Sequence, residues 1–132
     1  MPNIPEGQPV LDEEFFDRLF RVGGHDLVRN MIDAFLSNAP RRIAAAERGL
    51  AANDLDATER AVHSLKSTSG NLGGVELQLL AERVEALAAA RDPAGVAPLI
   101  PDLAPALARL RERLLAERPP DADGTRRLGR GT

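Results

Sequence analysis

The chain has 132 residues, of which 43% are hydrophobic and 28% charged, and its formal net charge is −3. This length and balance predict one globular domain with a modest core. The absence of cysteine excludes disulfides, thiolate metal sites and thiol catalysis. A negative net charge without tryptophan or tyrosine argues against nucleic-acid binding. Since no run of about 18 apolar residues and no basic, apolar leader is present, we expect a cytoplasmic protein without membrane contact.

The first half of the chain predicts two helical segments after a lead. Residues 1–10 contain three prolines and a glycine and predict a flexible lead. Asp12 can cap a short helix over "EEFFDRLFRV", which Gly23 and Gly24 end. Residues 25–53 then place apolar side chains at three- and four-residue steps, and Pro40 is expected to kink or split that helix.

The second half predicts three more segments and a tail. Asn53 is the expected N-cap of a helix that ends at "GNLGG" near residue 72. "VELQLLAERVEALAAAR" predicts the next helix, "DPAG" a turn, and the last helix ends near Arg118, with prolines that make its first turns irregular. Residues 119–132 are polar and rich in glycine and proline, which predicts a disordered tail.

Four long amphipathic segments with short connections predict an all-α fold, an antiparallel four-helix bundle with a short extra N-terminal helix, over residues 11–118. The predicted buried stripe of the His63 helix includes Leu55, Val62, Leu65 and Leu72. At about 100° per residue, His63 lies roughly 120° from the middle of that stripe, so it should face solvent.

His63 shares its helix face with a distinctive set of neighbours. Glu59, Lys66, Ser67 and Gly70 stand at i−4, i+3, i+4 and i+7, and Lys66 is the only lysine of the chain. The lysine disfavours a metal site, and a narrow bundle offers no evident oxyanion hole for a Ser-His-acid triad. A nucleophilic imidazole fits better, because imidazole side chains have an ordinary pKa of about 6.5 and keep a lone pair at neutral pH.

Lysine suits a site at which a phosphoryl group arrives on the imidazole. A phosphorylated side chain carries about −1.5 to −2 charges, and an ammonium on a flexible stem can follow it. The chain lacks an acidic metal cluster, a Walker loop and a kinase glycine-rich loop, so a partner would have to supply Mg²⁺ and an acidic pocket.

The stretch "HSLKSTSGNLGG" resembles the signature of histidine-containing phosphotransfer (HPt) domains, roughly His-x-Leu-Lys-Gly-Ser/Thr with a glycine ten positions after the histidine. His63, Leu65, Lys66 and Gly73 match this pattern, whereas Ser67 stands where the family commonly has glycine. The segments "VLDEEFFDRL", "MIDAFLSNAPRRI" and "LAERVEALA" are also similar to the family, so the resemblance covers residues 9–116.

The resemblance implies a carrier, not an enzyme, that accepts a phosphoryl group on His63 from the aspartyl phosphate of a receiver domain or from a kinase and passes it to another receiver. It implies that Lys66 supports the phosphoryl group and that Ser67 and Gly70 keep the face open. The implied partners are response-regulator receivers or a hybrid histidine kinase, and the chain has no cofactor of its own.

We expect the partner to dock on apolar side chains around the histidine, and the helical wheel suggests Leu27 and Met31 together with Glu59. A monomer is expected, since a bundle with its own core need not dimerise. Two alternatives stay open: a module that docks on a receiver without transferring phosphate, and a helical scaffold whose histidine is incidental. His25 follows Gly-Gly and is expected only to start a helix.

Overall fold

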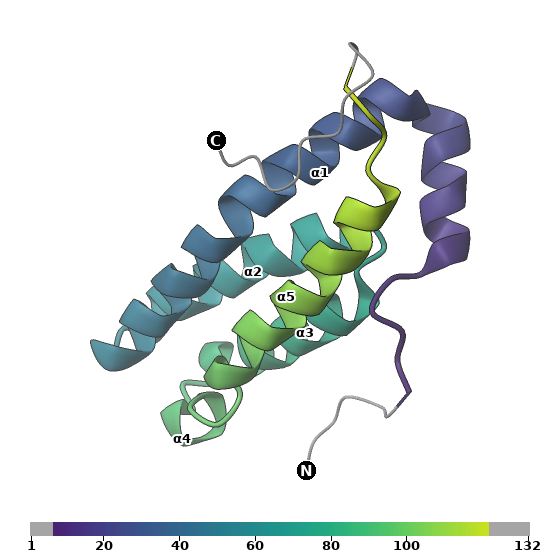
Figure 1. The fold of residues 1–132 in the computed structure, drawn as a ribbon. Coiled ribbons are helices and arrows are strands. Elements are labelled where there is room, and N and C mark those ends of the chain that lie inside the picture. Colours follow the sequence, from purple (N-terminus) through teal and green to yellow (C-terminus); the bar gives the residue numbers. More distant parts are fainter. Residues whose placement is uncertain (1–6, 122–132) are drawn as a thin grey trace.

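Four long helices build the protein, which is seen here in a computed structural model that describes residues 7–121 (Figure 1). The elements are α1 (Glu13–Ala51), α2 (Leu55–Asn71), α3 (Val75–Ala89), the one-turn α4 (Pro93–Val96) and α5 (Ile100–Glu117). The described residues contain no strand, which confirms the predicted all-α fold. The predicted flexible lead and tail fall partly outside the described residues, at 1–6 and 122–132.

α1 consists of two parts that meet at Gly24. This glycine has φ 83° and ψ 172°, a backbone conformation that glycine adopts without strain and that interrupts the helix. Residues 13–23, here called the N-terminal arm, run at a clear angle to residues 25–51 (Figure 1). The arm is the short extra helix predicted from the sequence.

The sequence predicts that Pro40 kinks or splits the long helix, and of these two outcomes the split is wrong. Gly24 is the only position inside α1 with non-helical backbone angles, so the helix continues through Pro40. Proline removes the hydrogen bond to the carbonyl four residues earlier, but Pro40 is exposed and that carbonyl can be hydrated.

Specific contacts attach the N-terminal arm to the end of the bundle that holds the α2–α3 turn. The carboxylate of Asp12 accepts a hydrogen bond from the Phe15 amide at 3.1 Å and caps the arm. The Asp12 amide donates to the Gly73 carbonyl at 2.8 Å, which connects the arm to the α2–α3 turn. Phe16 is 2% exposed, and its ring meets Phe20 edge to face at 5.2 Å. The arm therefore closes one end of the bundle.

α2 begins one residue later than predicted. Asp54, and not Asn53, is the N-cap, and its carboxylate accepts from the Ala57 amide at 3.1 Å. Asn53 has φ 57°, a left-handed conformation that asparagine tolerates better than most residues, and its amide donates to the Leu50 carbonyl. Asn53 thus completes the turn between α1 and α2.

The irregular start predicted for the last helix is confirmed, because residues 97–99 form turns between α4 and α5. The "DPAG" segment, predicted as a turn, forms α4, whose cap Asp92 accepts from the Gly95 amide at 3.0 Å. Pro98 lies between α4 and α5, and Pro101 occupies the first turn of α5, where its missing amide hydrogen is not needed.

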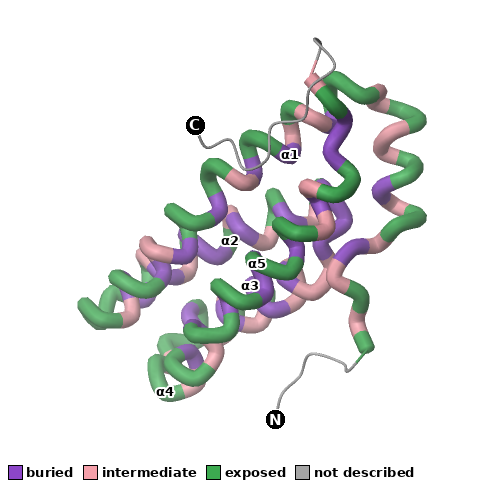
Figure 2. Tube along the Cα trace, in the orientation of Figure 1, coloured by how far each residue is buried: buried purple, intermediate pink, exposed green. Residues whose placement is uncertain are grey.

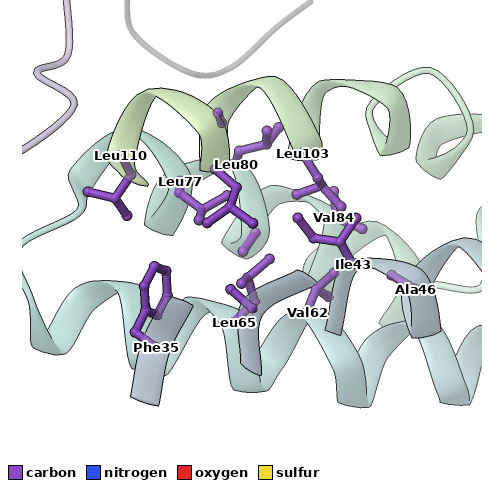
Figure 3. Packing of buried hydrophobic residues seen from close by; sticks show 14 of the residues in the cluster. Phe35, Ile43, Ala46, Val62, Leu65, Leu77, Leu80, Val84, Leu103 and Leu110 are labelled. Carbon is purple, nitrogen blue, oxygen red and sulfur yellow. The ribbon is translucent and has the colours of Figure 1, made fainter. Parts of the chain in front are cut away.

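The core lies between α1, α2, α3 and α5. Buried side chains of all four helices point toward one another in Figure 3, and Figure 2 shows that each helix buries one face and exposes the other. Residues without measurable exposure include Val28, Ile32, Val62, Leu65, Leu77, Val84, Leu103 and Leu114. The buried stripe predicted for α2 is therefore correct, and it turns His63 outward.

The chain after α5 folds back on α1. The Arg118 guanidinium is 2% exposed and donates to both carboxylate oxygens of Asp33 in α1, at 2.7 and 2.8 Å, and to Asp121 at 2.8 Å. Arg29 donates to the Pro120 carbonyl at 3.0 Å. Residues 118–121, here called the C-terminal clasp, therefore pack against the bundle, although the sequence predicted a tail from residue 119.

Candidate functional site

His63 projects from the middle of α2 into solvent. Its side chain is 61% exposed, while Val62 and Leu65 on the opposite side of the helix have no exposure. The imidazole can therefore be reached by a second protein without any movement of the bundle.

Glu85 of α3 holds one nitrogen of the imidazole. Its Oε2 lies 2.6 Å from Nδ1 of His63, and the Glu85 side chain is only 18% exposed. An ionised carboxylate can only accept, so in the neutral imidazole Nδ1 carries the proton and Nε2 has the lone pair. The contact thus favours the tautomer in which Nε2, and not Nδ1, is the ring nitrogen that can react with another molecule.

The same carboxylate binds Lys66, one helical turn beyond the histidine. The Lys66 Nζ lies 2.7 Å from Oε1 of Glu85. This hydrogen bond raises the pKa of Lys66 above its ordinary value, against a smaller opposing effect of burial, and nearby Glu82 raises it further. Burial alone would raise the pKa of Glu85, but the hydrogen bonds from Lys66 and His63 outweigh it, so the pKa is lowered. Glu85 and Lys66 are both charged at neutral pH.

The other residues predicted to share the histidine face differ in what they contact. Ser67 is exposed, so its hydroxyl is free to meet an incoming group. Gly70 faces α3, where a Cβ would lie 2.8 Å from Nε2 of Gln78. Glu59 is paired with Arg91 at 3.6 Å and does not contact His63 in the described residues. Gly70 therefore leaves room for the Gln78 side chain of α3.

A groove runs between α1 and α2 next to the histidine. The side chains that line it, here called the α1–α2 groove, are Met31, Ala34, Phe35, Asn38, Arg42, Ser64, Thr68, Asn71 and Leu72. Ser64 directly follows His63, so the groove begins beside the imidazole. Met31, one of the predicted docking residues, lines the groove. Leu27 lies one turn earlier on α1 and is 46% exposed.

The sequence reasoning missed Glu85 because its contact with His63 crosses from α3 to α2. Residues on one helix share a face through fixed spacing, but a contact between helices depends on how the two helices are rotated against each other. One signal was present: Glu85 directly follows the core residue Val84 and lies on a helix expected to pack beside α2. That signal places Glu85 at the edge of the buried face of α3, but it does not identify His63 as the residue that Glu85 contacts.

Two further classes of site were searched in the described residues. Between residues 7 and 121, no group of three or more His, Asp or Glu side chains is arranged to hold a metal ion. Within the same range, no helix combines the length and hydropathy needed to cross a membrane.

Comparison with known proteins places these features in a family. The Hpt domain family matches the chain over residues 30–117, and the chain therefore belongs to the Hpt domain family. The crystal structure of histidine-containing phosphotransfer protein B (HptB) from Pseudomonas aeruginosa PAO1 superimposes with a TM-score of 0.78 at 26% sequence identity, over 85% of this chain and 96% of that chain. The search of curated protein sequences found no match.

The fold and the family together define a histidine phosphotransfer carrier, a class of phosphocarrier proteins that work with receiver domains and histidine kinases in two-component relays. The matched range includes α2 and α3, the two helices that hold His63, Lys66 and Glu85.

Proposed function

We propose that His63 accepts a phosphoryl group from the aspartyl phosphate of a receiver domain, or from a kinase, and passes it to another receiver. The observation that supports this most directly is the exposed imidazole whose Nδ1 is bound by Glu85, which leaves the Nε2 lone pair toward solvent. The proposal gives Lys66 the role of holding the phosphoryl oxygens.

In this proposal Nε2 attacks phosphorus while the bond from phosphorus to the aspartate oxygen breaks, and the aspartate leaves as a carboxylate with the electron pair. The ring then carries a phosphoryl group on Nε2 and a proton on Nδ1, so it is positively charged. Glu85 stabilises that charge through the 2.6 Å contact. Lys66, 2.7 Å from the other oxygen of Glu85, lies one helical turn from His63 and can turn to the phosphoryl group.

We assign the Mg²⁺ and the acidic pocket of the transfer to the receiver. In-line phosphoryl transfer depends on positioning and on neutralising the charge of the phosphoryl oxygens, and Mg²⁺ is bound through carboxylates and phosphates. This chain contributes the nucleophile, the cation Lys66 and a surface for the receiver, for which Met31 and Leu27 at the α1–α2 groove are the first candidates. Ser67 supplies a small, exposed neighbour that leaves room for the receiver.

The proposal is tested in two steps with the whole chain. Phosphoramidate, a small phosphoryl donor, should add one acid-labile phosphoryl group to the wild type and to His25→Gln but none to His63→Gln, as measured by intact mass. His25 is the matched control because it is the other exposed histidine. Labelling of His63→Gln equal to the wild type would exclude His63.

The second step uses a panel of purified receiver domains, charged with acetyl phosphate in the presence of Mg²⁺. At least one receiver should transfer its phosphoryl group to the wild type, and Lys66→Ala should slow that transfer about 10-fold or more while keeping the helical circular dichroism spectrum, because one charge-assisted hydrogen bond to the phosphoryl group is lost. Labelling by phosphoramidate with no transfer from any receiver would instead support a module that docks without transferring phosphate.

A further inference from the structure

The contact with Glu85 orients the ring of His63. Nδ1 of the ring lies 2.6 Å from Oε2 of Glu85 on α3. The two nitrogens of an imidazole project to different sides of the ring, because one carbon separates them. A group bound to Nε2 therefore projects away from Glu85. The side chains of α2 that can contact such a group are those on the side of His63 that is turned away from α3.

Lys66 lies on the α3 side of His63. Its Nζ is 2.7 Å from Oε1 of Glu85, and its side chain is 29% exposed. Glu85 thus holds the ammonium on the same side of the ring as Nδ1. A phosphoryl group on Nε2 would meet the lysine from one side only, and its other side needs different donors.

Arg60 and Ser67 lie on the opposite side of His63. At about 100° per residue, Lys66 is rotated about 60° from His63 toward α3, whereas Ser67 is rotated about 40° in the other direction. Arg60, three residues before His63, is rotated about 60° in that same direction. Burial agrees with these positions, since Arg60 and Ser67 are exposed and Lys66 is half-buried. Nε2 therefore has Arg60 in the preceding turn and Ser67 in the following turn as neighbours.

The guanidinium of Arg60 forms no ion pair with any side chain of residues 7–121. Asp56 stands at i−4 from Arg60, a spacing that suits a helical ion pair, but its carboxylate is bound by Arg91. Glu59 is also paired with Arg91, at 3.6 Å. Because helical side chains lean toward the N-terminus of their helix, the ring of His63 leans over the turn that holds this arginine.

The hydroxyl of Ser67 has no hydrogen bond within the part of the chain that the structure describes. The next two hydroxyls of α2 are occupied: those of Thr68 and Ser69 donate to the carbonyls of Ser64 and Leu65, at 3.0 and 2.7 Å. The Ser67 side chain leans back toward the turn that precedes it, where the histidine stands. Its hydroxyl is therefore placed to donate to a group on the ring.

We propose that Arg60 and Ser67 bind the phosphoryl group on Nε2 of His63 from the side opposite Lys66. This rests on the proposed function, because it requires that His63 is phosphorylated. A phosphorylated side chain carries about −1.5 to −2 charges, more than one ammonium neutralises. The planar guanidinium presents parallel N–H donors that match two phosphoryl oxygens, and the serine hydroxyl adds one further hydrogen bond. Lys66 can then serve the phosphoryl group from the Glu85 side.

The test uses the whole chain, labelled on His63 with phosphoramidate, and follows the ³¹P NMR signal of the phosphoryl group against pH. A cation beside the group favours its dianion, so removing that cation raises the pH of the titration midpoint. Arg60→Gln should raise the midpoint by at least about 0.5 pH unit, and Arg60→Lys, which keeps the charge, should raise it less. Ser67→Ala should also raise it less than Arg60→Gln, because only a neutral donor is lost.

Arg111→Gln is the matched control, because Arg111 is exposed on α5 and the substitution makes the same change of charge. Its midpoint should equal that of the wild type. In ¹H–¹⁵N spectra of the wild type, phosphorylation should shift the side-chain Nε–H signal of Arg60 and leave that of Arg111 in place.

The outcomes separate this proposal from the proposed function. If phosphoramidate labels His63 but the wild type and Arg60→Gln share one midpoint, the proposed role of Arg60 is wrong and the carrier function stands. A raised midpoint in Lys66→Ala without one in Arg60→Gln would show that the lysine alone binds the phosphoryl group. An unchanged midpoint in Ser67→Ala would remove the serine from the site. A wild type that phosphoramidate does not label would refute His63 as the nucleophile, and this proposal with it.

Discussion

At the scale of single residues, the site depends on a carboxylate that binds two neighbours at once. Glu85 contacts His63 with one oxygen and Lys66 with the other, at 2.6 and 2.7 Å. The sequence predicted that His63, Lys66, Ser67 and Gly70 share a face, because that follows from helical spacing alone. It could not predict Glu85, because that contact depends on the rotation of α3 against α2.

Two substitutions separate the two contacts of Glu85. In Glu85→Gln the amide oxygen can still accept from Nδ1 of His63 but no longer pairs with a charged Lys66, whereas Glu85→Ala loses both contacts. We expect the imidazole ¹⁵N shifts of Glu85→Gln to keep the Nδ1–H tautomer and those of Glu85→Ala to show a tautomer mixture. Identical tautomer populations in the wild type and Glu85→Ala would contradict the positioning role of Glu85.

The ion pair also predicts how stability depends on pH. The pKa of Glu85 is lowered from its ordinary value of 4.5, so its contribution is present above that value and is lost as the pH falls through the lowered pKa. The pKa of Lys66 is raised from its ordinary 10.5, so the pair persists through neutral pH. Urea unfolding should show the wild type more stable than Glu85→Gln at pH 7, with the difference vanishing well below pH 4.5. A difference that stays constant into acid would contradict the pairing.

At the scale of elements, α1 and α2 approach each other closely at a point that no sequence pattern indicated. The Thr58 hydroxyl is buried and donates to the Ala46 carbonyl at 3.0 Å. Gly49 faces the same point, where a Cβ would lie 2.4 Å from Thr58 Oγ1 and 2.8 Å from the Thr58 backbone nitrogen. The sequence indicated the helices through their apolar spacing, but the crossing point depends on this absence of a side chain.

Gly49→Ala is therefore expected to lower the free energy of unfolding by about 1–3 kcal/mol, because the added methyl group forces two backbones apart. Helix propensity alone predicts the opposite sign, a gain of up to about 1 kcal/mol for alanine over glycine inside a helix. Chemical denaturation followed by circular dichroism decides between the two effects. A variant more stable than the wild type would show that the crossing is looser than described.

The element scale also shows how the boundary predictions fared. The break at the Gly23–Gly24 pair is confirmed at Gly24, because a positive φ there needs a residue without a Cβ. The predicted split at Pro40 is wrong, because the exposed proline leaves a carbonyl that water can bind and the helix continues. The predicted cap at Asn53 is also wrong, because Asn53 adopts a left-handed conformation in the turn before α2. The exact ends of the helices depend on the conformation of single residues, whereas the presence of each helix follows from the spacing of its apolar residues.

At the scale of the whole molecule, the C-terminal clasp connects the end of α5 to the middle of α1. Arg118 is 85 residues from Asp33 in the sequence, and "ERPPDAD" has the composition of a tail, so no sequence pattern indicates their pairing. In the structure, the buried guanidinium binds Asp33 and Asp121 and raises the pKa of Arg118. The clasp thus adds a polar contact between α1 and the end of α5, two helices that otherwise contact each other through the apolar core.

Arg118→Ala should lower the free energy of unfolding by about 2 kcal/mol, less than a fully buried ion pair because Asp33 remains 45% exposed. Arg109→Ala is the matched control: Arg109 also forms a two-bond pair, with Glu76, but it is 51% exposed. Arg109→Ala should lower the free energy of unfolding by less than about 1 kcal/mol. Equal losses in urea unfolding would show that burial of Arg118 contributes nothing to stability.

His63, Lys66 and Glu85 all belong to α2 and α3, which are consecutive in the chain and make the most extensive helix–helix contact of the described residues. The site is therefore local in sequence: its members are at most 22 residues apart, and one short turn closes the loop between them. Contacts of this kind form quickly and reopen together with their own hairpin. Fraying of α5 or release of the C-terminal clasp would thus leave His63, Lys66 and Glu85 in register, so the proposed site can stay assembled while α5 and the clasp move.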